Sequence, residues 1–416
     1  MAILFKGISG NMKAMVVTVG TGHGVESGIL ASIKQNNPDY IIFLTTEKGK
    51  ETLQRESLRA EINKRKCDVR IIENENDAEK CYKTAKEMIK KLKDEGYSIC
   101  VDFTSGTKAM TGGIVLAAII EETPSLVYVT GERDKNGRVI PHTERVYSIP
   151  SPTEVIVDFK KKLLAIMFNN CQFYDCLSII NEVKSSIIPK KLEDYSLKKL
   201  EIIVNAYYLW DLFEHEKAFN ELNKIKVKEI ADLATDVTQL GKNKEFLGIL
   251  TRNKEDKFLL VDIICNAKRR MNEGKFDDAV ARLYRAIEFI GQIALKDFGV
   301  DVKDFSLEAL KKLPIGEEKK GFYEKFAEDG KIRIGVRNIY RLLDDLGSEI
   351  GKRFKEDKEL HNLLTNRNKS ILAHGNKPVE KEDAQKLYRK VLEYAEILFK
   401  DIDVLMKKAE FIKLKG

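Results

Sequence analysis

Histidine is scarce in this sequence, and the few copies present are not arranged as metal ligands. The 416 residues include five histidines, with no HExxH pair and no cysteine and histidine cluster at ligand spacing. Protein-bound transition metals usually depend on such imidazole and thiolate clusters. We therefore expect no obligatory metal, and any catalysis has to rely on a small number of side chains.

Paired cysteines and long apolar runs are missing as well. The six cysteines are scattered without CxxC spacing, which indicates reduced, mostly buried thiols rather than disulfides or a zinc site. No run approaches the roughly 18 apolar residues that a membrane span requires, and residues 1–12 do not form a secretory signal. We expect a soluble, cytoplasmic protein without a membrane partner.

Charge is what the sequence has in quantity. Charged residues make up 33% and hydrophobic residues 43%, which is enough for two or three domains that each bury a core. Lysine and arginine number 72 against 65 acidic residues, a net charge of +7. This moderate excess favours an anionic partner without proving one, because most of the charges are explained by a solvated surface.

The first 150 residues alternate short β-branched runs with amphipathic helical stretches, the pattern of a parallel sheet in an α/β domain. The expected strands are 15–19, 40–45, 68–72, 98–103 and 126–130, with 144–149 as an edge strand or hairpin partner. An Asn-Gly pair within 134–139 indicates the turn that joins the last two. The sequence does not decide whether residues 1–11 are a mere extension.

From Pro150 onward the strand patterns give way to helices. The stretches 159–183 and 197–222 are typical of packed antiparallel helices, with Trp210 in their core. A charged stretch at 241–257 indicates a second, softer boundary. We predict an α/β domain at 1–150, a helical spacer at 151–257 and a helical C-terminal domain at 258–416.

Two glycine-rich segments follow the first and the fourth expected strands, GTGHG from Gly20 and DFTSGTK from Asp102. Both loops should open at the carboxyl edge of the sheet, where helix N-termini favour phosphate and glycine lets the backbone approach a ligand. Three hydroxyls and a lysine add donors and positive charge. A tight turn explains either loop alone equally well, but the pair favours a nucleotide-like anion. The predicted lining is Gly20, Thr21, Gly22, His23, Thr104, Ser105, Gly106, Thr107 and Lys108.

Two better-known phosphate motifs are not met. Val25 stands where the G-x-G-x-x-G fingerprint requires its third glycine, which weakens a dehydrogenase interpretation. Glu47 lies near the position of a ribose-binding acid, so that interpretation is not eliminated. The segment from Gly106 to Lys108 lacks the order and spacing of a Walker loop.

The segment RNKSILAHG, residues 367–375, places an arginine and a histidine among apolar residues. At ~100° per residue, one helical stripe contains Leu360, Leu363, Leu364, Arg367, Ile371 and His374. Gly375 and Pro378 predict the helix end, which puts His374 in the last turn, where the helix dipole favours protonated imidazole. An interpretation in which Arg367 snorkels from the core edge and His374 only caps the helix explains the spacing about as well.

A two-fold axis across this stripe would bring two arginines and two histidines to one cleft. Such a composite site could bend an RNA strand so that a 2′-hydroxyl attacks the adjacent phosphate, without a metal or a protein nucleophile. The shortage of metal ligands fits this chemistry.

With these motifs, the sequence resembles the type III CRISPR-associated ribonucleases that join a CARF sensor domain to a HEPN effector domain. VTVGTGHG and DFTSGTKAM resemble the paired CARF ligand loops, and RNKSILAHG fits the HEPN pattern of an arginine, a polar residue and a histidine. The resemblance implies a Rossmann-like CARF sheet, a helical spacer and a helical HEPN domain. It assigns catalysis to Arg367 and His374, with Asn368 orienting them.

The resemblance also implies an antiviral homodimer in which bound cyclic oligoadenylate activates metal-independent cleavage of single-stranded RNA. Cyclic tetra-adenylate is expected ahead of the hexa-adenylate, and no cofactor beyond this activator is implied. Slow cleavage of the activator through Thr21, His23 or Thr107 is a secondary hypothesis. The segment 282–289 is expected to supply a helix that packs on the catalytic one. Arg285 and Glu288 are candidate partners for it, and a place in the core stripe of their own helix explains them at least as well.

A different class of function stays open, namely a nucleotide-sensing regulator or adaptor whose C-terminal helices only dimerise or bind a partner. No helix-turn-helix or winged-helix signature is visible, which weakens a DNA-binding version. A dehydrogenase is disfavoured further because no plausible catalytic pair lies in a second domain.

Overall fold

The computed structural model describes residues 12–135, 139–140, 142–150, 153–186, 197–372 and 375–416. The chain divides into two compact units, residues 1–160 and 161–416. The boundary between them falls inside helix α6, Thr153–Asn169. Residues 1–11 and the central residues of the expected 134–139 turn lie outside the described part of the chain. The division into three domains stays a prediction.

The first unit is built on a six-stranded sheet with the order β3-β2-β1-β4-β5-β6. The strands are β1 Lys13–Val19, β2 Tyr40–Thr45, β3 Lys66–Ile71, β4 Ser98–Asp102, β5 Ser125–Thr130 and β6 Arg145–Pro150. The first five run parallel, and β6 is antiparallel to β5. Each strand lies within two residues of its predicted bounds, and the predicted hairpin pairing of the last two is confirmed.

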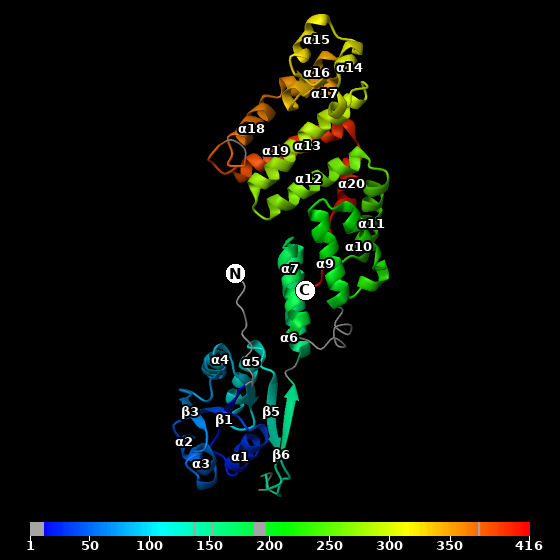
Figure 1. The fold of residues 1–416 in the computed structure, drawn as a ribbon. Coiled ribbons are helices and arrows are strands. Elements are labelled where there is room, and N and C mark those ends of the chain that lie inside the picture. Colours follow the sequence, from blue (N-terminus) through cyan, green and yellow to red (C-terminus); the bar gives the residue numbers. More distant parts are fainter. Residues whose placement is uncertain (1–11, 136–138, 141, 151–152, 187–196, 373–374) are drawn as a thin grey trace. The chain divides into compact units, whose positions relative to one another are not determined.

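Helices cover both faces of this sheet (Figure 1). They are α1 Val25–Asn36, α2 Lys50–Leu53, α3 Glu56–Ile62, α4 Ala78–Asp94 and α5 Lys108–Ile120. Successive strand residues face opposite ways, so Met15 and Val17 pack with α1, whereas Ala14 and Val16 pack with α4 and α5. Burial on both faces explains why β1 and β2 are nearly continuous apolar runs.

In its described residues, the second unit is built of helices and a two-stranded ribbon. Its first helices are α7 Phe173–Ser186, α9 Leu197–Asp211, α10 His215–Asn223, α11 Val237–Arg252, α12 Asp256–Asn272 and α13 Phe276–Lys296. The later elements are α14 Leu307–Lys312, α15 Glu317–Glu324, β7 Ala327–Glu328, β8 Lys331–Ile332, α16 Val336–Asp345, α17 Glu349–Glu356, α18 Lys358–Asn368, α19 Lys381–Leu398 and α20 Ile402–Ala409. Short 3₁₀ turns occupy Val227–Ile230 and Val302–Asp304.

The two long helical stretches expected after residue 150 are each broken into a helix pair. Cys171 separates α6 from α7 and Phe213 separates α9 from α10, both with positive φ. Trp210 is fully buried, as predicted. Most of the charged stretch at 241–257 is helical, since α11 continues to Arg252 and buries Phe246 and Leu250. The softer boundary predicted there thus falls largely within helical structure, and it stays a prediction.

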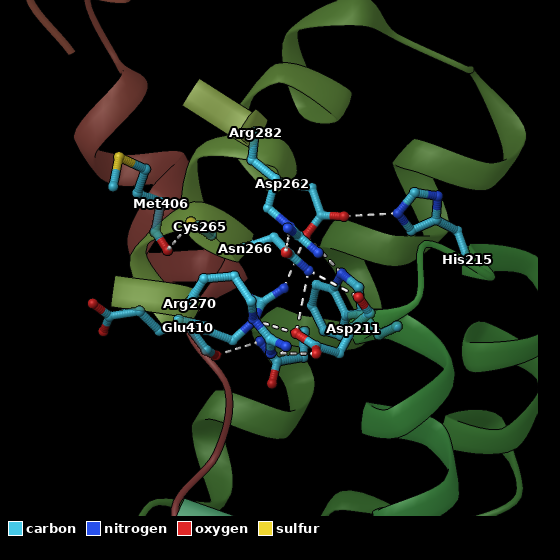
Figure 2. Close-up of polar contacts among 12 residues, drawn as sticks. Asp211, His215, Asp262, Cys265, Asn266, Arg270, Arg282, Met406 and Glu410 are labelled. Atoms are coloured by element: carbon cyan, nitrogen blue, oxygen red, sulfur yellow. Dashed lines mark hydrogen bonds and ion pairs between the residues drawn. The ribbon is translucent and has the colours of Figure 1, made fainter. Parts of the chain in front are cut away.

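A cluster of charges is buried between α9 and α12, close to the C-terminal segment of the chain (Figure 2). Asp211 accepts a hydrogen bond from Arg269 Nε at 2.8 Å and another from Arg270 Nη2 at 2.5 Å. Asp262 accepts one from Trp210 Nε1 at 2.9 Å. Each buried carboxylate thus has donors that offset its desolvation, and the cluster joins α9 and α10 to the rest of the helical unit.

Candidate functional site

The two glycine-rich loops meet where the strand order of the sheet reverses. β1 and β4 are neighbours in the middle of the sheet, and the chain leaves them toward opposite edges. In doubly wound sheets this switch point is where ligands bind, because loops on the two sides diverge there. The fold therefore brings together the two segments that the sequence predicts to form one site.

Backbone contact between the loops requires glycine at position 20. A Cβ on Gly20 would lie 2.8 Å from the Gly106 nitrogen, and the Gly20 N–H donates to Ser105 Oγ at 3.3 Å. The Ser105 hydroxyl in turn donates to the Thr18 carbonyl. The loops are thus held as one rigid edge before any ligand arrives.

The predicted hydroxyl donors are largely used within the protein. Thr107 caps α5 by accepting from the Met110 N–H at 3.2 Å, and it donates to the Glu75 carbonyl. Thr104 Oγ1 accepts from the Val129 N–H at 2.8 Å. Ser105 and Thr107 each donate their one hydroxyl hydrogen to a carbonyl, so their contact with a ligand stays a prediction. The backbone N–H groups are the better donors.

Asp102 anchors the second loop from below. Its side chain is 1% exposed, and Oδ1 accepts from the Thr104 backbone N–H at 2.8 Å. Burial raises the pKa of the Asp102 carboxyl, and the hydrogen bonds it accepts, that from Thr104 among them, oppose this shift. This aspartate shapes the loop rather than contacting the cavity.

A cavity of about 760 Å³ opens over the two loops. It is lined by eight of the nine predicted residues, Gly20, Thr21, Gly22, His23, Thr104, Ser105, Gly106 and Thr107. Lys108 is not among the lining residues: it is exposed at the first position of α5, and its contact with a ligand stays a prediction. The cavity is nevertheless built mainly by the segments that the sequence singled out.

Sequence reasoning missed the contributions of neighbouring loops to this cavity. Lys48 reaches it from the loop after β2, Tyr128 from β5 and Arg133 from the segment after β5, and Glu75 and Glu144 also line it. The ends of β2 and β5 lie at the same sheet edge, so the rule applied to β1 and β4 could have indicated Lys48 and Arg133. Cations and backbone N–H groups suit phosphates, while the carboxylates accept hydrogen bonds from amino or hydroxyl groups. The lining suits a nucleotide.

Arg367 occupies the last turn of α18, in the second unit. Leu360, Leu363 and Leu364 are buried on the same stripe of this helix, and Arg367 ends that stripe. The Arg367 guanidinium lies 4.3 Å from the centroid of the Tyr284 ring, and Nη1 donates to Asn368 Oδ1 at 3.2 Å. Across the described residues, Arg367 has no carboxylate within ion-pair distance. A guanidinium held by an aromatic face keeps donors for a phosphate.

The helix ends six residues earlier than the sequence suggested. α18 stops at Asn368, and the chain turns back so that the Ile371 N–H donates to the Lys377 carbonyl at 3.0 Å. Gly375 packs directly on the Lys369 carbonyl, where a Cβ would overlap it. This turn stops the helix, and Ile371 is 59% exposed rather than part of the apolar stripe. His374 lies outside the described residues.

Tyr284 is the contact of Arg367 that sequence reasoning missed. It belongs to the segment 282–289, which was expected to pack on the helix carrying Arg367, and α13 does contact α18. Arg285 and Glu288 are not partners of α18: they pair with each other at 2.7 Å. The signal available in the sequence was the position of Tyr284, an aromatic residue between Arg282 and Arg285.

Neither a metal-binding cluster nor a membrane-spanning helix occurs among the described residues. They hold no group of three or more histidine, cysteine, aspartate or glutamate side chains that could bind a metal ion. Within the same residues, no helix is long and apolar enough to cross a bilayer.

The fold and the two sites define a two-part protein, in which a Rossmann-like unit with a cavity at its switch point is joined to a helical unit. The helical unit presents an arginine that has no carboxylate partner among the described residues. Three family models match successive parts of the chain: the Card1 CARF domain at residues 29–152, the Csm6 6H domain at 159–248 and the Csm6 HEPN domain at 250–398. The chain belongs to the CARF–HEPN family of type III CRISPR-associated proteins.

Solved structures agree with the fold. Enterococcus italicus Csm6 bound to cyclic hexa-2′-fluoro-hexa-dAMP matches with a TM-score of 0.58 and 14% identity, covering 96% of this chain and 100% of that chain. Can2 from Sulfobacillus thermosulfidooxidans in complex with cyclic tetra-adenylate has a TM-score of 0.23 and 13% identity over 50% of this chain and 68% of that chain, too low to carry an argument. No curated protein matches the sequence.

Proposed function

We propose that this chain is an antiviral endoribonuclease whose CARF unit binds cyclic oligoadenylate and thereby activates cleavage of single-stranded RNA in the HEPN unit. The observation that carries the proposal is Arg367, a guanidinium without a carboxylate partner in the described structure, held against Tyr284 inside the segment that matches the Csm6 HEPN domain. The fit of the 760 Å³ cavity to a nucleotide supports the sensor half.

The proposed catalytic unit is a homodimer. Arg367 and His374 of two chains would face each other across a two-fold axis, with Asn368 holding the guanidinium by its 3.2 Å contact. The 2′-oxygen of one nucleotide forms a bond to the adjacent phosphorus while the bond to the 5′-oxygen breaks. One histidine takes the 2′-hydroxyl proton and the other protonates the leaving oxygen, and the arginines stabilise the phosphorane charge without a metal.

The first test is activated cleavage in the presence of EDTA. Labelled single-stranded RNA should be cut when cyclic tetra-adenylate is added and stay largely intact without it, because the activator biases the enzyme toward its active state. Parallel reactions with cyclic hexa-adenylate decide how many nucleotides the activator ring contains. This comparison matters because the similar Csm6 structure holds an analogue with six nucleotides. Loss of cleavage in EDTA would contradict the metal-independent mechanism. Binding of the cyclic oligoadenylate without RNA cleavage would favour the alternative function, a nucleotide-sensing regulator or adaptor.

The sensor half has its own test at Gly20. In Gly20→Ala the new methyl would meet the Gly106 nitrogen at 2.8 Å, so the loops must separate. We expect the affinity for the cyclic oligoadenylate to fall at least about ten-fold, a loss near 1.4 kcal/mol. Isothermal titration calorimetry measures it.

Gly112→Ala is the matched control for Gly20→Ala. Gly112 lies in α5 with open space around its Cβ position and does not line the cavity. The alanine there should bind as the unmodified protein does, and its helix propensity is better than that of glycine. Equal affinities of the two variants would show that the contact between the loops does not shape the ligand site.

A further inference from the structure

Two further arginines, Arg337 and Arg341 of α16, lie where α16 faces α18, beside the Arg367 site. Arg337 Nη2 donates to Thr365 Oγ1 at 3.2 Å, which places the start of α16 against the last turns of α18. One helical turn away, Arg341 of α16 and His361 of α18 line a cavity of about 620 Å³ together with Arg337. The two helices thus present basic side chains at successive turns.

The charges in this cavity leave the arginines available. Asp344 pairs with Lys355 at 2.7 Å, and Asp345 pairs with Lys319 at 2.8 Å and accepts from Tyr323 at 2.6 Å. Both carboxylates that line the cavity are therefore neutralised by lysines.

Neither of these two arginines is paired with an acid. Among the residues that the structure describes, Arg337 and Arg341 have no carboxylate within ion-pair distance. The Arg341 guanidinium lies 3.7 Å from the centroid of the Phe322 ring. Stacking fixes the plane of a guanidinium without using its N–H groups. The two arginines form a net positive surface with free hydrogen-bond donors.

This surface adjoins the proposed catalytic residues. A second hollow, of about 290 Å³, is lined by Tyr284, Arg337, Asn338 and Asn368 among others. Arg337 therefore borders both hollows, and Tyr284 and Asn368 are the residues that hold Arg367. A chain lying in the hollows would pass from Arg341 over Arg337 to Arg367.

We infer that this α16–α18 groove, defined by Arg337, Arg341 and His361, binds the backbone of the RNA substrate on one side of the phosphate that is cleaved. The inference rests on the proposed ribonuclease function and adds the substrate path to it. Arg337 and Arg341 are one turn apart, about 6 Å of helix rise, so each can contact a different phosphate of one strand. Charged contacts to the backbone supply affinity without sequence preference.

The test separates binding from chemistry in the activated full-length protein. Arg337→Ala and Arg341→Ala should each raise the KM for a 20-nucleotide RNA about ten-fold, because each loses one charged contact, while kcat stays within about two-fold. A tetranucleotide too short to reach the groove should be cut equally by all variants. Arg341→Lys, which keeps the charge, should recover most of the KM.

Arg333→Ala is the control, since Arg333 is exposed, pairs with Glu328 at 3.6 Å and lines neither hollow. If wild-type protein cleaves and the KM values of the Arg337 and Arg341 variants equal that of Arg333→Ala, the groove is not the RNA path and the proposed function still stands. The groove is then open to another anion, such as an acidic protein segment.

Binding of intact RNA gives an independent measurement. In an Arg367→Ala background, fluorescence anisotropy against salt should show a slope of log affinity that is smaller by about 0.7 for each arginine removed from the groove. If wild type cleaves no RNA, the ribonuclease proposal fails, and an unchanged slope here would overturn the groove as well. Thermal unfolding close to that of wild type confirms that the variants are folded.

Discussion

Arg367→Ala is expected to lower activated RNA cleavage about 100- to 1000-fold, the loss seen when one preorganised electrostatic group is removed from an active site. Arg367 is available for this role because Tyr284 and Asn368 hold it while no described carboxylate neutralises it. Single-turnover cleavage at saturating RNA measures the effect. His374→Ala should show a loss of similar size, since general acid or base catalysis contributes about 100- to 10,000-fold.

Arg353→Ala is the matched control, because Arg353 is exposed on the neighbouring helix α17 and pairs with Glu393 at 2.8 Å. It should cleave within about two-fold of wild type. An Arg367 variant that behaves like this control would contradict the assignment of catalysis to α18.

Mixing subunits tests whether the site is composite. An excess of inactive Arg367→Ala protein, allowed to exchange with wild type, should reduce activity below that of the same amount of undiluted wild type. The reason is that each mixed dimer would lack one of the two arginines. Activity that depends only on the amount of wild-type chain would mean that each chain carries a complete site.

Asp211→Ala should destabilise the helical unit by about 3–5 kcal/mol, the cost of breaking a buried ion pair from one side. The variant leaves the largely buried Arg270 with Glu273 alone and the buried Arg269 with Asp262 at 3.8 Å. Trp210 is the one tryptophan of the sequence and donates to Asp262 in the same cluster. Its fluorescence during urea unfolding therefore reports on this part of the protein.

Glu245→Ala gives the comparison, because its pair with Lys408 at 2.9 Å is largely exposed. Exposed pairs contribute about 0–1 kcal/mol. If Asp211→Ala unfolds at the same urea concentration as Glu245→Ala, the buried cluster does not stabilise the helical unit. The comparison requires that the slope of the unfolding free energy against urea concentration be the same in both variants.

The α/β unit was the more predictable half. Its strands are short, β-branched and bounded by turn residues, and burial on both faces makes the apolar runs of β1 and β2 unmistakable. The reversal of strand order between β1 and β4 then brings Gly20 and Ser105 to one edge by topology alone. The exposure of Lys108 could not be predicted, because a residue in the first turn of a helix can face either the cavity or the solvent.

The helical unit was harder, for reasons visible at two positions. Periodicity continues through residues 367–374 at the helical spacing, yet α18 stops at Asn368 because the chain folds back and packs Gly375 on Lys369. The stack of Arg367 on Tyr284 joins residues 83 positions apart. The arginines of the α16–α18 groove are available because lysines from other helices pair with the nearby acids. Single-helix patterns contain neither kind of information.

The sequence by itself determined the class of each half, the two glycine loops and the arginine at the end of a helix, because these depend on local pattern and on the direction of parallel strands. Only the tertiary structure decided which groups are free to act. Ser105 and Thr107 are used to hold loops, Lys108 faces solvent, and Arg337, Arg341 and Arg367 have no carboxylate partner in the part of the chain that the structure describes. The physical reason is that a charge or donor is available to a ligand only when no neighbour distant in the sequence has already paired with it.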